Sequence, residues 1–389
     1  MTEKLYYLDA YLGKFECKVI NLYTNERYIY VETDKTAFFP EGGGQTSDRG
    51  WLGEAYVENV QLKDGKILHF VEKNEENVKK LQNSTVLQGK IDMKKRFSDM
   101  QQHSGEHIFS GIVHKLYGYN NVGFHLGSEV VTLDFNGALN EDDICKVENL
   151  VNEAIWKNLE IRILYPSDEE LKSISYRSKI EIEGQVRIVE IDGIDTCACC
   201  APHVKRTGEI GIIEVVNFEK YKGGTRVSIL CGERALKDIR HKLNENRKVS
   251  VITKAKQSET ASAVERLLNE KERLDFELVG ANREILMSKA ESIEGGKRIV
   301  IFDKKLDGKL LMEFTESVKN KATDFVACFC GENGLYRYCI ASKSLNLSDF
   351  AKELNSAFNG KGGGRGEMIQ GSLSGSEEEI TDFLNKINL

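Results

Sequence analysis

Hydrophobic and polar residues alternate over residues 1–90. The runs FECKVINLYT, RYIYVETDKTAFF, WLGEAYVENVQLKDGKILHFV and TVLQGKID place apolar side chains at every second position. This period is typical of strands with one buried face. Turn-forming residues, such as those of KDGK, separate the runs. Short strands at this spacing favour a small β-barrel, so we predict one over residues 1–90.

The period changes near Arg96 to that of a helix. In SDMQQHSGEHIFSGIVHKLYG, apolar residues recur three and four apart, with Ser98 as a candidate N-cap and Gly118 as a candidate C-terminal stop. A second helix is expected over EDDICKVENLVNEAIWKN, and strands over FHLGSEVVTLDF, EIRILYP and most of residues 185–232. This mixture predicts an α+β domain over residues 91–240.

The rest of the chain divides into a helical stretch and a final domain. Residues 236–293 predict one long helix with apolar residues at two heptad positions, which favours a coiled coil or helical hairpin as much as a helix along its own domain. We assign residues 241–293 to a helical linker. Residues 294–389 predict a separate α/β domain, with a strand, a helix, two strands, a helix, a glycine-rich loop and a last helix. The predicted fold class is therefore α+β overall.

The composition is that of a globular protein in a reducing compartment. The chain has 389 residues, of which 40% are hydrophobic and 30% charged, with a net charge of -7. We find neither a run of about 18 apolar residues nor a signal peptide, so no membrane association is expected. The nine cysteines are odd in number and favour free or metal-bound thiols in a cytoplasmic protein.

Two histidine-containing motifs predict a metal site. QQHSGEHIF places His103 and His107 one helical turn apart on the same side. Such a pair needs further ligands, and DTCACCAPHV offers Cys199 and His203, also four apart. Three imidazoles and a thiolate suit tetrahedral zinc. These ligands lie on two distant elements, which indicates a cleft more than a small zinc knuckle.

Other interpretations of these motifs stay open at this point. Cys197 or Cys200 could replace Cys199 as the thiolate ligand. Taken alone, such a histidine pair is more often a pair of ordinary core residues than a metal site, and the CxxxH motif is what raises the metal interpretation. A zinc-protease motif requires a glutamate directly after the first histidine, whereas Glu106 stands directly before the second, so we disfavour a protease.

Two glycine runs predict close approach of a ligand to the backbone. AFFPEGGGQTSDRG (residues 37–50) contains Gly42–Gly44, but its spacing is that of neither a P-loop nor a dinucleotide motif. A wide hairpin turn is the alternative. In NGKGGGRGEMIQG (residues 359–371), Lys361 and Arg365 alternate with glycines, which suits phosphate or a nucleic-acid backbone. Here a solvent-exposed loop is the alternative.

Together these motifs resemble the long form of the free-standing alanyl-tRNA editing proteins of the AlaX type, which are similar to the editing and C-terminal domains of alanyl-tRNA synthetase. The family's aromatic-Pro-Glu-Gly-Gly-Gly-Gln pattern matches Phe39 to Gln45, and its HxxxH and CxxxH motifs match the four candidate ligands. The tail glycine run looks like that of the C-terminal domain shared with DHH-type phosphoesterases. Two departures are Thr46, where the family carries proline, and Cys200–Pro202, where it usually carries Gly and Thr.

The resemblance implies a trans-editing hydrolase. Its substrate would be mischarged tRNA(Ala), chiefly Ser-tRNA(Ala) with Gly-tRNA(Ala) as a second candidate, deacylated at a site with one Zn2+ per chain. It also implies a homodimer through the C-terminal region. The residues carried over are His103, His107, Cys199 and His203 as zinc ligands, Thr36 for the serine hydroxyl, Gln45, Gly43 and Gly44 for the ester or terminal ribose, and Lys361, Arg365 and Arg226 for tRNA.

Three rival functions compete with this one. One is a tRNA-binding module with a structural zinc, and another is editing of a different mischarged tRNA, such as a threonyl-tRNA. The third is a phosphoesterase, suggested only by the tail domain and disfavoured because the DHH motif is absent from the sequence.

Overall fold

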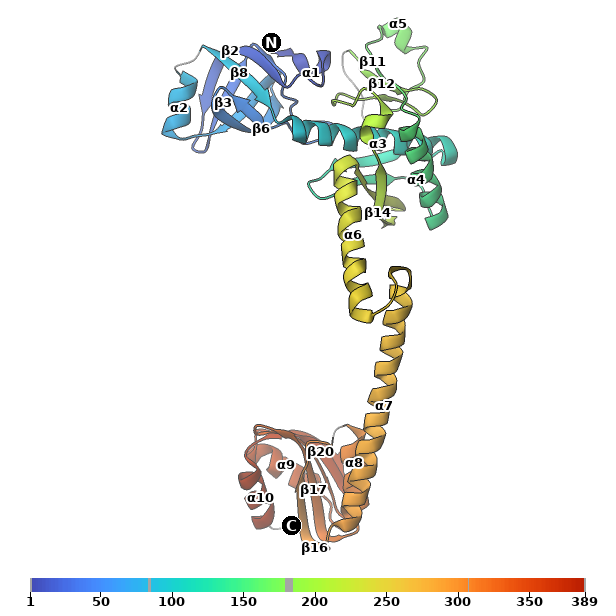
Figure 1. Ribbon diagram of the computed structural model, residues 1–389. Helices are drawn as coiled ribbons and strands as arrows, with labels where there is room; N and C mark the ends of the chain where they lie inside the picture. Colours follow the sequence, from blue (N-terminus) through green and yellow to red (C-terminus); the bar gives the residue numbers. More distant parts are fainter. Residues whose placement is uncertain (1, 83–84, 179–184, 307, 388–389) are drawn as a thin grey trace. The chain divides into compact units, whose positions relative to one another are not determined.

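The computed structural model describes residues 2–82, 85–178, 185–306 and 308–387 (Figure 1). The chain forms two compact units, Met1–Arg247 and Lys248–Leu389. Both units mix helices and strands, as the sequence predicts. Among the described residues, no helix combines the length and apolar character that a membrane span requires.

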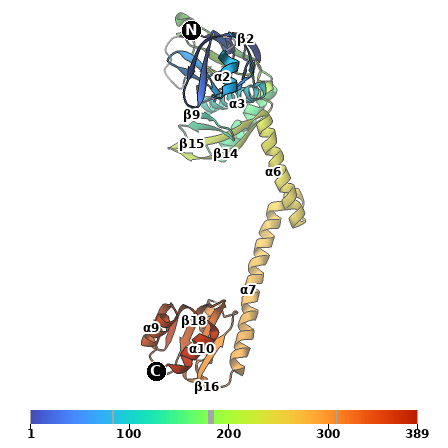
Figure 2. The same ribbon diagram turned by 90° about the vertical axis from the view of Figure 1, so that its left-hand side faces the viewer.

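Six strands of the first unit form a closed ring where the sequence predicts a small barrel (Figure 2). Each strand pairs antiparallel with two neighbours, and the buried positions alternate along the strands as expected. A short parallel pair, β1 (Glu3–Lys4) with β4 (Lys35–Thr36), lies outside this ring, as do α1 (Leu5–Leu8) and α2 (Glu75–Gln82). In ring order the strands are β2 (Lys14–Thr24), β3 (Tyr28–Thr33), β7 (Lys66–Glu72), β6 (Ala55–Lys63), β5 (Gly50–Leu52) and β8 (Val86–Ile91).

Helix α3 (Met93–Tyr117) carries the histidine motif and is buried along most of its length. Every residue from Asp99 to Val113 is buried. The predicted N-cap at Ser98 is wrong, because Asp92 caps the helix earlier by accepting hydrogen bonds from the amides of its first turn. The predicted stop is confirmed: Gly118 has a φ of 72°, and its amide bonds back into the last turn.

The α+β part of this unit packs α3 and a second helix on a four-stranded antiparallel sheet. The apolar side chains of both helices and the sheet form one core. The predicted second helix is confirmed as α4 (Glu141–Trp156). A smaller sheet and the short helices α5 (Asp168–Leu171) and η1 (Thr207–Ile210) complete it. The sheets are β14 (Ile213–Tyr221), β15 (Gly224–Cys231), β10 (Val131–Phe135) and β9 (Asn121–Leu126), and then β11 (Ile161–Leu164), β12 (Ile188–Ile191) and β13 (Asp195–Ala198).

The predicted single helix over residues 236–293 is wrong, since two helices replace it. They are α6 (Gly232–Thr253) and α7 (Thr260–Ser292), with the short η2 (Gln257–Glu259) before α7. Lys254 has a φ of 52°, which ends α6. The Ser250 hydroxyl donates to the carbonyl of Ala255 across this turn. Serine side chains that bond nearby backbone compete with helix propagation in this way.

The second unit is a three-layer α/β domain. Its sheet has the order β16 (Gly296–Phe302), β17 (Ala322–Glu332), β18 (Leu335–Ala341), β20 (Met368–Ser374) and β19 (Lys361–Arg365). One core joins α9 (Ser348–Ala357) and α10 (Glu377–Lys386) to one face, and a second joins α7 and α8 (Lys309–Lys319) to the other (Figure 1). The predicted order of helices and strands is confirmed from β16 to α9 and for the last helix, α10.

The glycine run near the C-terminus is a hairpin, so the predicted loop over residues 359–371 is wrong. Strands β19 and β20 pair antiparallel through this run. A Cβ atom on Gly362 would lie 2.4 Å from the Gln370 carbonyl oxygen and 2.7 Å from the Tyr338 hydroxyl. Glycine therefore lets the two backbones and the tyrosine approach closely.

Candidate metal centre

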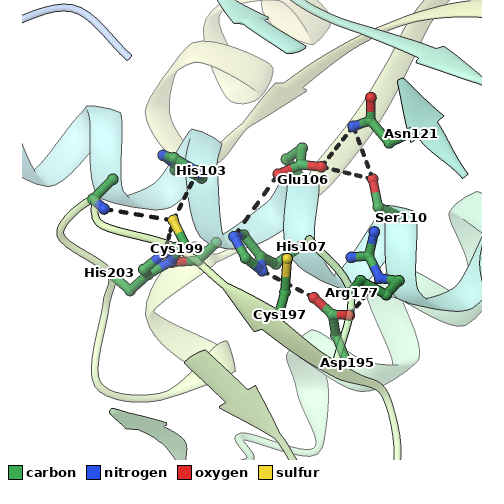
Figure 3. A network of polar contacts seen from close by, with 12 residues as sticks. His103, Glu106, His107, Ser110, Asn121, Arg177, Asp195, Cys197, Cys199 and His203 are labelled. Atoms are coloured by element: carbon green, nitrogen blue, oxygen red, sulfur yellow. Dashed lines mark hydrogen bonds and ion pairs between the residues drawn. The ribbon is translucent and has the colours of Figure 1, made fainter. Parts of the chain in front are cut away.

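Four side chains from two elements converge at one point of the first unit (Figure 3). His103 and His107 come from α3, and Cys199 and His203 come from the loop after β13. Their ligand atoms all lie within 4.8 Å of one another. The Nε2 atoms of His103 and His203 lie 3.6 Å and 3.4 Å from the Cys199 sulfur. The structure thus brings together the four side chains singled out from spacing.

The loop that carries the cysteine is held by backbone contacts. Arg187 donates from Nη1 to the carbonyl oxygens of Cys199 and Ala201, at 2.6 Å and 3.0 Å. The helix approaches β15 closely beside the histidines, because a Cβ atom on Gly105 would lie 2.4 Å from the Cys231 sulfur. Gly105 therefore fixes how deeply the histidine pair lies in the core.

Each imidazole is held at Nδ1 by a partner from outside the group. The amide oxygen of Gln45 and the Asp195 carboxylate only accept, so the Nδ1 atoms they contact carry hydrogen and Nε2 is the atom that would bind a metal. Metal-binding histidines are oriented by second partners in this manner. The pairs are His103 with Gln45 Oε1 at 2.8 Å, His107 with Asp195 Oδ2 at 2.9 Å, and His203 with Ser104 Oγ at 3.0 Å.

The charges at the centre favour a cation. Burial raises the pKa of the Cys199 thiol, but the imidazoles of His103, His107 and His203 outweigh burial and hold it well below its usual range. Burial lowers the pKa of His203 to about 3, so this ring is neutral. Burial also lowers the pKa of His107, but its contacts with Asp195 and Cys199 outweigh burial and raise it. The raised pKa means that His107 carries an extra proton. A metal ion bound here would displace this proton and would then be held by a thiolate and neutral imidazoles, which are the ligand forms that it requires.

The same electrostatics distinguish the three neighbouring cysteines. Cys197 forms a second buried group with His107 and Asp195, whose ligand atoms also lie within 4.8 Å of one another. Burial raises the pKa of Cys197, and burial together with the Cys199 charge raises the pKa of Cys200. Only Cys199 of these three has a lowered pKa, which favours it as the thiolate ligand.

A buried carboxylate beside the centre was missed by sequence reasoning. Glu106 accepts hydrogen bonds at Oε1 from Ser110 and Asn121, both at 2.7 Å, and its Oε2 lies 4.0 Å from His107 Nε2 (Figure 3). Asp195 was missed as well, although it lies two residues before Cys197 on β13. It also accepts from Arg177 at 2.8 Å, so a buried polar network surrounds His107.

The first glycine loop lies against the loop that carries Cys199 and His203 and against β9. Gly43 and Gly44 have positive φ angles of 61° and 80°. A Cβ atom on Gly43 would lie 3.5 Å from the Cys200 sulfur, and one on Gly44 would lie 2.6 Å from the Phe124 ring. Gln45 is buried, and its Nε2 has no hydrogen-bond partner among the described residues. A buried amide nitrogen without a hydrogen-bond partner is suited to donate to an oxygen atom of a bound ligand.

Thr36 is fully buried at the end of β4. Its hydroxyl lies 2.8 Å from His69 Nε2. The neighbouring Ala37, Phe38 and Phe39 belong to a core cluster against which Cys199 packs, together with Ala201. The segment with Thr36 thus lies against the loop that carries Cys199 and His203, although the described residues show no hydrogen bond between Thr36 and the four converging side chains.

The predicted tRNA contacts lie in both units. Arg226 of β15 pairs with Asp134 at 2.6 Å, and its guanidinium lies 3.7 Å from the centroid of the Tyr221 ring. Lys361 and Arg365 stand on β19, where every residue is exposed. These two cations are accessible, whereas Arg226 already has an acidic partner.

A polar cleft opens next to the glycine loop. Its volume is about 870 Å³. Thr46 and Ser47 of the loop, Leu126 of β9, and the cations Lys95 and Arg234 are among the residues that line it. A ring of strands and an α+β domain thus hold a buried group of three histidines and one cysteine beside a glycine loop, and this group could hold a metal ion.

Comparison with known proteins identifies the family. Residues 186–228 match the threonyl and alanyl tRNA synthetase second additional domain, and residues 292–389 match the DHHA1 domain. The chain is 28% identical to the alanyl-tRNA editing protein AlaX-L of Pyrococcus horikoshii, over 98% of the chain and 97% of that protein. It is 37% identical to AlaX-M of Saccharolobus solfataricus, over 58% of the chain and 98% of that protein. The alanine–tRNA ligase of Pyrococcus furiosus is 27% identical over 97% of the chain and 42% of the ligase. The chain belongs to the family of alanyl-tRNA editing proteins, which are deacylating hydrolases.

Proposed function

We propose that this chain deacylates mischarged tRNA(Ala), chiefly Ser-tRNA(Ala) and secondarily Gly-tRNA(Ala). One observation supports this proposal above others. In a chain of the alanyl-tRNA editing family, the ligand atoms of His103, His107, Cys199 and His203 lie within 4.8 Å of one another, and each imidazole is held at Nδ1. Such an arrangement is suited to hold a metal ion next to an ester.

The cation we propose is zinc, one per chain. The fit rests on the donor set, since three imidazole nitrogens and a thiolate are ligands that zinc prefers, and an oxygen-preferring ion would need carboxylates. When bound, zinc supplies a Lewis acid that polarises or orients an ester carbonyl. The chain itself would supply the three imidazoles and the thiolate that hold the ion, and the buried Asp195 carboxylate keeps the His107 ring oriented.

Selection and positioning of the aminoacyl group fall to the glycine loop and Thr36. We assign Thr36 to the hydroxyl of a misattached serine. We assign Gln45 Nε2 and the amides of Gly43 and Gly44 to the ester or the terminal ribose, since the buried Nε2 has no partner among the described residues. A synthetase pocket built for alanine rejects small mimics weakly, and a second site that bonds the serine hydroxyl adds discrimination.

Three basic residues are proposed to contact the tRNA. Lys361 and Arg365 offer exposed cations for phosphates. Arg226 offers those of its N–H groups that do not bond Asp134.

The assembly and the domain division are proposals as well. We propose a homodimer through the C-terminal region and a division into four parts, at residues 1–90, 91–240, 241–293 and 294–389. The family matches at 186–228 and 292–389 support the second and fourth parts. The cytoplasmic location stays a prediction.

A deacylation assay tests the function. Purified protein is incubated with tRNA(Ala) charged with serine, glycine or alanine, and loss of each ester is followed. We expect rapid hydrolysis of Ser-tRNA(Ala) and sparing of Ala-tRNA(Ala), with loss of hydrolysis in Cys199→Ala. Equal rates on the seryl and alanyl esters would refute the selectivity. Tight tRNA binding with zinc present but no hydrolysis would favour the rival, a tRNA-binding module with a structural zinc.

A further inference from the structure

A buried histidine, His69, contacts the Thr36 hydroxyl and is not one of the four candidate metal ligands. His69 lies on β7 and is fully buried. Its Nδ1 lies 2.9 Å from the Val31 carbonyl oxygen, and its Nε2 lies 2.8 Å from the Thr36 hydroxyl oxygen. Both ring nitrogens therefore have fixed partners.

The two contacts determine which nitrogen carries hydrogen. A carbonyl oxygen only accepts, so the Nδ1 that faces Val31 must donate. Burial lowers the pKa of His69 to about 4, so the ring is neutral near pH 7 and carries a single N–H. Nε2 is then an acceptor, and the Thr36 hydroxyl donates its hydrogen to it.

The Thr36 oxygen is consequently restricted in what it can offer. Its only hydrogen points to His69, and one of its lone pairs accepts from the amide of Phe38 at 3.1 Å. A hydroxyl oxygen has two lone pairs, so one lone pair is left. Thr36 can accept one more hydrogen bond and can donate none.

We infer that His69 is a positioning residue for amino-acid selection, because it makes the Thr36 oxygen an obligate acceptor for a hydroxyl donor on the substrate. This inference rests on the proposed function, in which Thr36 contacts the aminoacyl group. Serine carries such a donor, whereas alanine carries none and leaves the acceptor unsatisfied. Glycine carries none either, so this contact favours serine over both. A side chain that offers only an acceptor is rejected for the same reason.

A matched pair of variants separates this role from simple packing. Glutamine places its amide oxygen near the position of His69 Nε2 and keeps an acceptor for Thr36. Asparagine places its amide nitrogen near Nδ1 and keeps the bond to Val31, but loses that acceptor. We expect His69→Asn to lower the ratio of kcat/KM for the seryl over the alanyl ester by about tenfold, and His69→Gln to keep most of it. Zinc content and thermal unfolding of both variants show whether the fold is intact.

The substrate supplies an independent readout. Wild-type protein should cleave tRNA(Ala) esterified with β-fluoroalanine about as slowly as the alanyl ester, because fluorine resembles the hydroxyl in size but cannot donate. Rapid cleavage of the fluoroalanyl ester would overturn the inference, as would equal loss of selectivity in His69→Asn and His69→Gln with the fold intact. Thr36→Val tests the proposed function itself. If Thr36→Val erodes selectivity and His69→Asn does not, only the inference about His69 fails.

Discussion

Asp195 is the one charged group that holds an imidazole of the metal centre at Nδ1. Its Oδ2 lies 2.9 Å from His107 Nδ1, and the carboxylate side chain is 2% exposed. The corresponding partners of His103 and His203 are a neutral amide and a neutral hydroxyl. Asp195→Asn keeps the shape of the side chain but removes its charge. It therefore tests how strongly an oriented, charge-stabilised imidazole contributes to zinc affinity.

The expected magnitude follows from the type of hydrogen bond that is lost. Bonds to charged groups contribute about 1.5–3 kcal/mol and neutral ones about 0.5–1.5 kcal/mol. Since about 1.4 kcal/mol corresponds to tenfold, Asp195→Asn should weaken zinc binding by about 10- to 100-fold. Ser104→Ala removes the neutral partner of His203, at 3.0 Å, and should weaken binding by less than about tenfold.

Zinc affinity is measured by competition with a chromogenic chelator at fixed pH, with circular dichroism to confirm that each variant is folded. Asp195 also accepts from Arg177, so thermal unfolding is compared in parallel. Zinc affinity that is unchanged in Asp195→Asn would refute the orienting role of the carboxylate. A larger loss in Ser104→Ala than in Asp195→Asn would refute the argument from charge.

The remaining predictions concern the ligand cysteine, the buried histidine and the exposed cations. Elemental analysis should find about one zinc per chain in wild type and in Cys197→Ser but far less in Cys199→Ser, because only Cys199 has a lowered pKa. The folded pKa of His69, about 4, lies below the unfolded value of 6.5. Stability present at pH 7 is thus lost as pH falls from about 6.5 to 4, by about 3 kcal/mol at most. Chemical denaturation of His69→Gln should show a flatter pH dependence over this window. Lys361→Ala and Arg365→Ala should each weaken tRNA binding and reduce the slope of log affinity against log salt by about 0.7–0.9, measured by filter binding.

The convergence of the four candidate ligands could be predicted from the sequence because they occur in two local patterns. His103 and His107 share one side of a helix, and Cys199 and His203 share one loop, so spacing alone identifies each pair. The partners that orient the rings could not be found in this way. Asp195 approaches His107 across 88 residues and Gln45 approaches His103 across 58, so only the tertiary fold places them.

The errors of the sequence-based fold also have local causes. Ser98 has the chemistry of an N-cap, but Asp92 caps the helix earlier. The single helix expected over residues 236–293 is broken at Lys254, because apolar periodicity does not register a positive φ at a single residue. The glycines near Lys361 belong to the edge strand β19. The sequence does not distinguish this strand from a loop, because close backbone packing and loop flexibility both favour glycine.

The glycine loop and the metal centre are positioned by one helix through two attachments. At the base of the loop, buried Arg96 of α3 bonds Asp48 from Nε at 2.7 Å, and its guanidinium also donates to the carbonyl of Ala37, next to Thr36. Near the tip, Gln45 bonds His103, two helical turns further along α3. Because seven residues bring two side chains back to the same helix face, both attachments act on one side of α3. The groups proposed to hold the ester and the groups proposed to hold the metal therefore keep a fixed separation, which is the preorganisation that ester hydrolysis at such a site requires.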